Sequence, residues 1–244
     1  MTAVAGARPL LDGYHRADGQ CIRISARQGS LFAKQVAGDF NPIHDEDSKR
    51  FCVPGDLLFA LALSRYGVRE RMDFSFAGMV GDGVPLCFPE IVEGDGAVTN
   101  DQGKALLNMH FAGSARGERD FCEALIRQYV AFSGQNFPHI LVPLLAESGV
   151  MINPDRPLVI YESMSLAFAT LIFRAPRLVL RDARLEVLGK RGDVRLHFDI
   201  EGDNGKVGEG TKKLAIGGLQ PYDEARMTAL VDAFLARKAG WTAY

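Results

Sequence analysis

The stretch GDLLFALALSRYG, residues 55–67, decides the fold. Leucine, phenylalanine and alanine occupy nearly every face of the helix that it predicts, so we expect this helix to be buried. After it the hydrophobic period changes to two, because apolar residues at 72, 74 and 76 alternate with Asp73 and Ser75. A sheet with one apolar face needs a cover. The sequence therefore predicts an antiparallel sheet with the buried helix lying across it.

Further segments follow the same two-residue period. Apolar residues alternate with polar ones at 107, 109 and 111, and again at 194, 196, 198 and 200. The turn-forming stretches TNDQGK (99–104) and EGDNGK (201–206) contain Asn, Asp and Gly, which favour tight turns. We therefore predict a β-hairpin at each of them.

Three pairs of segments recur in the same order along the chain. Residues 37–44 resemble 133–140 at an offset of 96, residues 72–80 resemble 164–172 at an offset of 92, and two D-x-G-K turns lie 102 residues apart. A common order and a similar offset indicate a duplicated unit. After it, an amphipathic stripe of Met227, Leu230, Val231, Phe234 and Leu235 predicts a terminal helix that packs on the body. The predicted parts are 1–118, 119–221 and 222–244.

Composition narrows the class of protein. The 244 residues are 47% hydrophobic and 24% charged with a net charge of −2, which disfavours binding to DNA or to an anionic membrane. The longest apolar stretch, residues 164–173, is shorter than the ~20 residues of a membrane helix, and the N-terminus lacks the pattern of a signal peptide. Without CxxC pairs or metal-ligand spacing, we expect a cytoplasmic protein that holds no metal and has reduced thiols at Cys21, Cys52, Cys87 and Cys122.

A polar loop precedes the buried helix. The stretch AGDFNPIHDE, residues 37–46, places Asp39 and His44 five residues apart. On a continuous helix these side chains would diverge by about 140°, but Pro42 prevents that helix and pushes Asn41 towards an extended conformation. The loop can therefore direct the carboxylate and the imidazole towards one point, where they would act as an acid–base pair on one water.

This loop, followed by VPGDLLFALALS, resembles the signature of the MaoC-like, (R)-specific enoyl-CoA hydratase (hydratase 2) family over ten residues. The resemblance implies an α+β double hotdog fold, in which each unit is an antiparallel sheet wrapped around a central helix. It also implies a hydro-lyase that adds water to a trans-2-enoyl thioester. Asp39 and His44 would be catalytic, Asn41 would fix the turn or bind substrate, and Gly55 would present its backbone N–H to the thioester. No cofactor is implied beyond the coenzyme A or acyl carrier protein that carries the acyl group.

The second copy of the loop has lost the acid–base pair. When Gly134 is aligned with Gly38, Gln135 replaces the aspartate and Ile140 replaces the histidine, so we expect one active site per chain. Two alternatives stay open: a hotdog acyl-CoA thioesterase, and a non-catalytic protein that binds acyl thioesters. Any further assembly is expected to be a homodimer.

Overall fold

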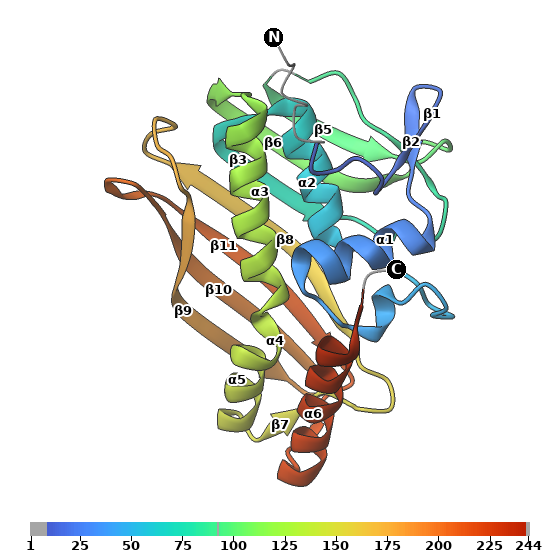
Figure 1. Cartoon of the computed structure of the whole chain (residues 1–244). Helices are drawn as coiled ribbons and strands as arrows, with labels where there is room; N and C mark the ends of the chain where they lie inside the picture. The colour runs from blue at the N-terminus through green and yellow to red at the C-terminus, as the bar shows by residue number, and fades with distance from the viewer. Residues whose placement is uncertain (1–8, 92, 243–244) are drawn as a thin grey trace.

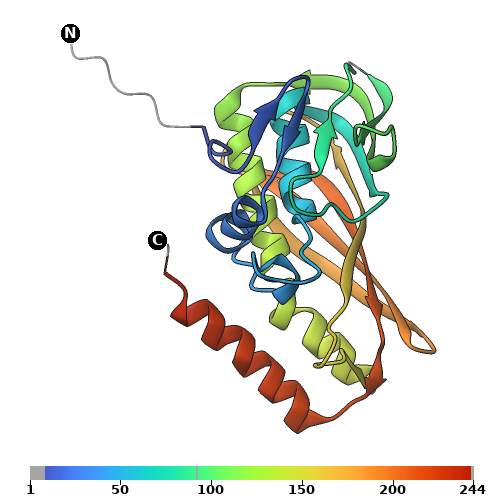
Figure 2. The same cartoon turned by 90° about the vertical axis from the view of Figure 1, so that its right-hand side faces the viewer.

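The computed structural model of the chain describes residues 9–91 and 93–242. In this part of the chain a large curved sheet lies on one side, and helices lie against its concave face (Figures 1 and 2). The helices are α1 (Ala26–Phe32), α2 (Gly55–Tyr66), α3 (Arg119–Gly134), α4 (Asn136–His139), α5 (Leu141–Glu147) and α6 (Glu224–Gly240), with the π-helical turn η1 (Ala33–Ala37) and the 3-10 turn η2 (Pro42–His44).

The main sheet has ten strands in the described residues, and every pairing in it is antiparallel. This confirms the predicted α+β hotdog fold and both predicted hairpins. In spatial order the strands are β1 (Arg16–Asp18), β2 (Cys21–Arg23), β4 (Pro85–Cys87), β5 (Gly94–Thr99), β6 (Ala105–Arg116), β3 (Val68–Phe76), β8 (Val159–Phe168), β11 (Gly205–Gly217), β10 (Arg191–Gly202) and β9 (Arg177–Leu188). Strands β7 (Val150–Met151) and β12 (Gln220–Pro221) form a separate pair.

The two halves of the sheet join through β3 and β8, which contain the segments predicted to be counterparts. Met72 pairs with Leu166 and Phe74 with Met164, in antiparallel register around Asp73 and Ser165. The predicted boundary after residue 118 lies just before α3, and the sheet continues from one half to the other through β3 and β8. The strands of the two halves therefore form one continuous sheet.

Helix α2 is buried along nearly its whole length, as its composition predicts. The preceding helix α1 begins earlier than its sequence predicts. A serine before the apolar residues of GSLFAKQVAG (29–38) favours an N-cap at Ser30, whereas Ser25 is the cap, in a reciprocal capping box with Gln28. Ser30 instead lies buried within the helix, where its Oγ accepts a hydrogen bond from Lys34 Nζ. A polar residue with a partner inside the turn is tolerated there, and the true cap lies five residues earlier.

The helices of the two halves differ in length. The second polar loop is followed by the seven-residue α5, whereas the first is followed by the twelve-residue α2. The sixteen-residue α3 precedes the second loop and packs against η1 and α2. Its inward stripe includes Phe121, Leu125, Tyr129 and Ser133. Because α5 is short, it does not by itself cover the end of the sheet near β7, and another element must complete the cover.

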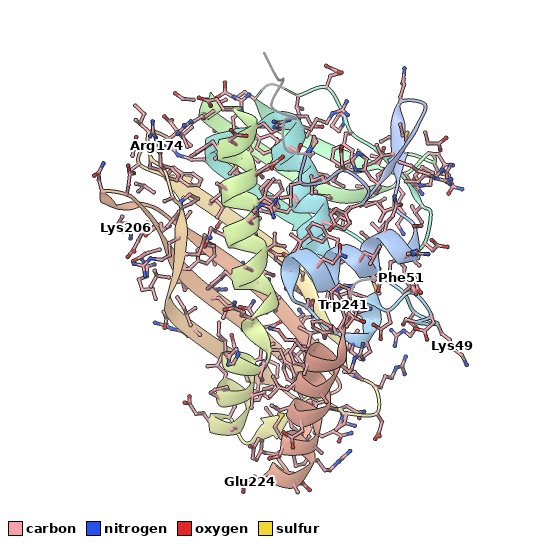
Figure 3. The ribbon with its side chains drawn as sticks, viewed as in Figure 1. Lys49, Phe51, Arg174, Lys206, Glu224 and Trp241 are labelled. Carbon is pink, nitrogen blue, oxygen red and sulfur yellow. A yellow bond between two sulfur atoms is a disulfide. The ribbon has the colours of Figure 1, made fainter. Side chains whose placement is uncertain are left out.

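The C-terminal helix α6 provides that cover, confirming the prediction that it packs on the body. It runs from Glu224, at the far end of the molecule, to Trp241, on the helical side (Figure 3). Met227 and Phe234 are buried, and Phe234 lies edge-to-face against Phe40 with 6.2 Å between ring centroids. Leu235 of the predicted stripe is exposed. None of the helices described, α6 included, has the length and apolar content needed to span a membrane.

One prediction about the cysteines is wrong. Cys21 and Cys87 face each other across the β2–β4 pair and form a disulfide. They are 66 residues apart in sequence, and only the pairing of these two short strands brings them together. Cys52 and Cys122 are free thiols.

Candidate active site

The loop that carries Asp39 is shaped by its own side chains. Gly38 ends η1 in the left-handed conformation, with φ of 64°, which favours glycine. Asp39 Oδ1 accepts a hydrogen bond from the Asn41 backbone N–H at 2.9 Å. Asn41 is extended and caps η2, because its Oδ1 accepts from the backbone N–H of Ile43 at 3.2 Å. The loop therefore has the geometry expected from Pro42, with Asn41 fixing the turn.

His44 has a defined orientation. Its Nδ1 lies 2.6 Å from the carbonyl oxygen of Cys52. A carbonyl only accepts, so Nδ1 carries the proton in this hydrogen bond, and Nε2 of the neutral ring keeps its lone pair. Nε2 lies 3.6 Å from Asp39 Oδ2. A water at a normal hydrogen-bond distance of about 2.8 Å from each atom could donate one of its two hydrogens to each acceptor.

These side chains line a cavity of about 500 Å³, a volume typical of small-molecule sites. All four residues singled out from the sequence lie in its wall: Asp39, Asn41, His44 and Gly55. The remaining wall is largely apolar and includes residues of β3, α5, β8 and α6, among them Phe76, Leu141, Val159, Tyr161, Leu230 and Phe234.

Helix α6 is held to the polar loop by charge. Arg237 on α6 forms an ion pair with Asp45, and Lys34 lies 2.9 Å from the same carboxylate. Asp45 follows the η2 turn directly. The C-terminal helix therefore serves as one wall of the cavity, a role that its amphipathic sequence does not reveal.

Gly55 begins α2 at the edge of the cavity. A Cβ at this position would lie 3.0 Å from the rings of both Phe76 and Tyr161, which is closer than ordinary van der Waals contact. Glycine therefore lets the helix start and the two rings pack together. The first backbone N–H groups of a helix have no acceptor within the helix and lie at the positive end of its dipole. This edge of the cavity suits an oxygen that gains negative charge.

A cluster of buried polar side chains lies beside Gly55. Asp56 follows it in α2, Ser133 lies in the last turn of α3, and Lys212 lies on β11. Ser133 Oγ donates to Asp56 Oδ2 at 2.6 Å and accepts a hydrogen bond from Lys212 Nζ. The Lys212 ammonium also lies 4.1 Å from the centroid of the Tyr161 ring. Ser133 thus bridges a buried acid and a buried base, and all three residues line the cavity.

Burial dominates the electrostatics of this cluster. It raises the pKa of Asp56 above that of an ordinary carboxyl; Lys212, Ser133 and His44 act in the opposite direction, and Asp39 adds to the rise. Burial lowers the pKa of Lys212, while Asp56 and Asp39 favour its charged form. Asp39 and His44 therefore act electrostatically on the cluster. Burial also raises the pKa values of Tyr129 and Tyr161 far above that of an exposed phenol, so both hydroxyls stay protonated at neutral pH.

The sequence contains signals for this cluster that lie outside the polar-loop motif. Lys212 lies on the inward-facing set of β11, between Gly210 and Leu214, where an apolar residue is normal. Asp56 stands directly before seven apolar residues of the same helix. A charged residue at an inward position predicts a partner, but the sequence alone does not say which one.

The second polar loop lies next to the first. Gln135 is exposed and, like Ile140, does not line the cavity. Asn136 and Phe137 do line it, and Asn136 is only 5% exposed. In the described part of the chain, no three His, Cys, Asp or Glu residues lie close enough to hold a metal ion.

Gly134 is the point at which the two loops touch. A Cβ there would lie 1.8 Å from the backbone oxygen of Ala37 and 3.4 Å from the backbone nitrogen of Asp39. We expect Gly134→Ala to push η1 away from α3, lower the free energy of unfolding by about 1–3 kcal/mol and displace Asp39. Urea unfolding would measure the loss of stability. Gly149→Ala is the comparison, because φ is positive there but the added Cβ has open space, so that its cost comes from backbone strain alone. Unchanged stability of Gly134→Ala would contradict the close approach of the two loops.

The fold and the cavity define an α+β hotdog protein with an Asp–His pair and a buried polar cluster in one site. The chain belongs to the family described as "Protein of unknown function (DUF3581)", which matches residues 10–225. No curated protein matches the sequence.

Several solved structures are similar in shape. One is a conserved protein of unknown function with a hotdog fold from Alicyclobacillus acidocaldarius, with 10% identity, a TM-score of 0.44, and coverage of 88% of this chain and 100% of that chain. An acyl-CoA thioesterase II from Mycobacterium marinum has 11% identity, a TM-score of 0.40 and coverage of 85% and 96%. A MaoC-like dehydratase has 9% identity, a TM-score of 0.40 and coverage of 82% and 97%.

Proposed function

We propose that the chain is a MaoC-like enoyl-thioester hydratase or dehydratase, a hydro-lyase that adds water across a trans-2-enoyl thioester or removes it. The observation that carries the proposal is the 3.6 Å separation between Asp39 Oδ2 and His44 Nε2 in the wall of a largely apolar cavity. Two acceptor atoms at this distance suit one shared water. The adjacent start of α2 suits the thioester oxygen.

The proposed reaction uses these groups in turn. The water bound between Asp39 and His44 forms a bond from its oxygen to Cβ of the substrate and gives a proton to the pair. The π electrons of the C=C bond move towards Cα and the thioester carbonyl, whose oxygen gains negative charge beside the backbone N–H of Gly55. Cα then takes a proton from the pair, which yields a 3-hydroxyacyl thioester and restores both side chains. The reverse steps expel water.

The cavity walls indicate the acyl part of the substrate. A volume of about 500 Å³ with mainly apolar walls supports a short or medium acyl group. The carrier is coenzyme A or an acyl carrier protein, both of which end in the same pantetheine arm.

A thioesterase is the second candidate, and Asp56 is the observation that favours it. This carboxyl lies one residue from the helix start that suits the thioester oxygen, and burial raises its pKa. A carboxyl of raised pKa is the kind of group that could direct a water at the carbonyl carbon instead of at Cβ.

Incubation with crotonyl-CoA and crotonyl-pantetheine tests the proposal. We expect the enoyl absorbance to fall without release of free thiol, and the product to be the 3-hydroxybutyryl thioester by mass spectrometry. Release of thiol at constant enoyl content would support the thioesterase. Thermal stabilisation by either compound with no chemical change would indicate a protein that binds acyl thioesters without catalysis.

A further inference from the structure

The buried polar residues of the chain are concentrated at one place. Five polar or charged residues are buried among those described, and four of them line the cavity: Asp56, Ser133, Asn136 and Lys212. They come from α2, α3, α4 and β11, which meet there. Polar residues in a core are normally placed for a reason, because each costs free energy unless it is hydrogen-bonded.

Three atoms of this group have no hydrogen-bond partner. They are Asp56 Oδ1 and both polar atoms of the Asn136 side chain, Oδ1 and Nδ2. Asp56 is 7% exposed and Asn136 is 5% exposed, so bulk water does not satisfy them. The other polar atoms of the cluster are occupied, since Ser133 is bonded to both Asp56 and Lys212. Two residues of the cavity wall therefore carry buried polar atoms that the protein itself leaves without a partner.

The charges and hydrogen-bonding atoms of these residues indicate which kind of ligand group could bind them. Lys212 and Asp56 compensate each other's charge through Ser133, so the four residues carry no net charge when the pair is ionised. A second anion would meet the carboxylates of Asp56 and Asp39, and a cation would meet Lys212. An uncharged group that both donates and accepts, such as a hydroxyl, can donate to Asp56 Oδ1 or to Asn136 Oδ1 and accept from Asn136 Nδ2.

We propose that Asp56 and Asn136, supported by Ser133 and Lys212, form a subsite for a hydroxyl group on the acyl chain of the substrate. The inference rests on the proposed function, in which the reacting carbons face Asp39 and His44. The hydroxyl bound here is then carried by a carbon other than the two that react, and the substrate class is the hydroxyacyl thioesters rather than plain alkyl ones. A site built to bond a hydroxyl rejects the analogue that lacks it, because its buried polar atoms are then left unpaired.

Binding of saturated thioesters tests the subsite without requiring the hydration reaction. The probes are pantetheine thioesters in matched pairs: 4-hydroxybutyryl against butyryl, and 5-hydroxyvaleryl against valeryl, with succinyl as the anionic probe. We expect the hydroxylated member of at least one pair to bind roughly 10-fold tighter by calorimetry, the effect of about one well-formed buried hydrogen bond. Release of free thiol is followed in parallel. If the protein hydrolyses these thioesters, the two members of each pair are compared by kcat/KM instead of by Kd.

Two variants separate binding from structure. Asn136→Leu removes an amide that has no partner in the free protein, so we expect Tm to rise by roughly 2–4 °C while the preference for the hydroxylated thioester falls below about 3-fold. Gln135→Leu is the matched control, since Gln135 is the exposed neighbour outside the cavity, and should change neither quantity.

The outcomes are distinct from those of the hydration assay. Equal affinity within both pairs would overturn the subsite and assign the unpaired atoms to buried water, even if crotonyl thioesters are hydrated. Tightest binding of the succinyl thioester would overturn the choice of an uncharged group. A lower Tm for Asn136→Leu would show that the amide is a structural element. A clear hydroxyl preference without hydration would keep the subsite and remove the proposed reaction.

Discussion

Replacing Asp39 with asparagine is expected to lower kcat for an enoyl thioester at least ~100-fold, the usual contribution of a positioned acid–base group. The chain should remain folded, because an asparagine Oδ1 can still accept the hydrogen bond that Asn41 N–H gives to Asp39 Oδ1. The amide cannot take a proton from the water shared with His44. Steady-state kinetics with crotonyl-CoA would measure the loss, and thermal unfolding would show that stability changes by less than about 0.5 kcal/mol.

His44→Ala removes the second member of the pair and should cost at least ~100-fold as well. It also deletes the hydrogen bond to the Cys52 carbonyl, so a stability loss of about 1 kcal/mol is expected in addition. Gln135→Ala, at the corresponding position of the second loop, is the control and should keep nearly full turnover, because Gln135 is exposed and outside the cavity. Unfolding of Asp39→Asn would make the aspartate a structural cap. Full activity of both folded variants would remove the catalytic assignment.

The sequence predicted the parts of the fold that depend on local patterns. The buried helix at 55–67, both hairpins and the packing of the C-terminal helix follow from hydrophobic period and turn composition, and the structure confirms them. The Cys21–Cys87 disulfide does not follow from such patterns, because the two strands that bring the cysteines together have three residues each and are too short to show a hydrophobic period. Non-local pairing of short strands leaves almost no trace in composition.

The candidate site likewise has one part that the sequence predicts and one part that it does not. The Asp39–His44 loop is continuous in sequence, so its proline and turn-forming residues are enough to indicate its shape. The cluster of Asp56, Ser133 and Lys212 comes from three elements separated by 77 and 79 residues in sequence. Each member looks like an isolated exception to an apolar pattern. Only the meeting of α2, α3 and β11 shows that the exceptions compensate one another, so sequence patterns alone do not identify the cluster.

The largest effect on stability is expected from Lys212→Met. This substitution keeps an unbranched side chain that is one atom shorter, but it leaves the Asp56 carboxyl buried without its countercharge, and breaking a buried pair in this way costs about 3–5 kcal/mol. Urea unfolding followed by circular dichroism would measure the free energy of unfolding. The double variant Asp56→Asn with Lys212→Met removes both charges and keeps an oxygen for the Ser133 hydroxyl, so it should regain at least ~2 kcal/mol relative to Lys212→Met alone.

The cost of Lys212→Met should also depend on pH, in a direction set by Asp56. Burial raises the pKa of this carboxyl in the folded chain, and Asp39 raises it further, whereas Lys212, Ser133 and His44 lower it; removing Lys212 therefore raises it again. A folded-state pKa above the ordinary carboxyl value means that the folded chain holds the proton more tightly than the unfolded chain. Stability is then lost as pH rises from the ordinary value to the raised one, by up to about 1.4 kcal/mol per pH unit.

Lys212→Met should therefore be less damaging at pH 5 than at pH 8, because protonation of Asp56 removes the uncompensated charge. The double variant has no carboxyl at this position and should lose this dependence. Lys213→Met is the matched control, since Lys213 is the exposed neighbour on the same strand and should change stability by less than about 0.5 kcal/mol at either pH. A cost that is equal at pH 5 and pH 8, together with a double variant no more stable than Lys212→Met, would mean that Asp56 and Lys212 do not form a charged pair in the folded chain.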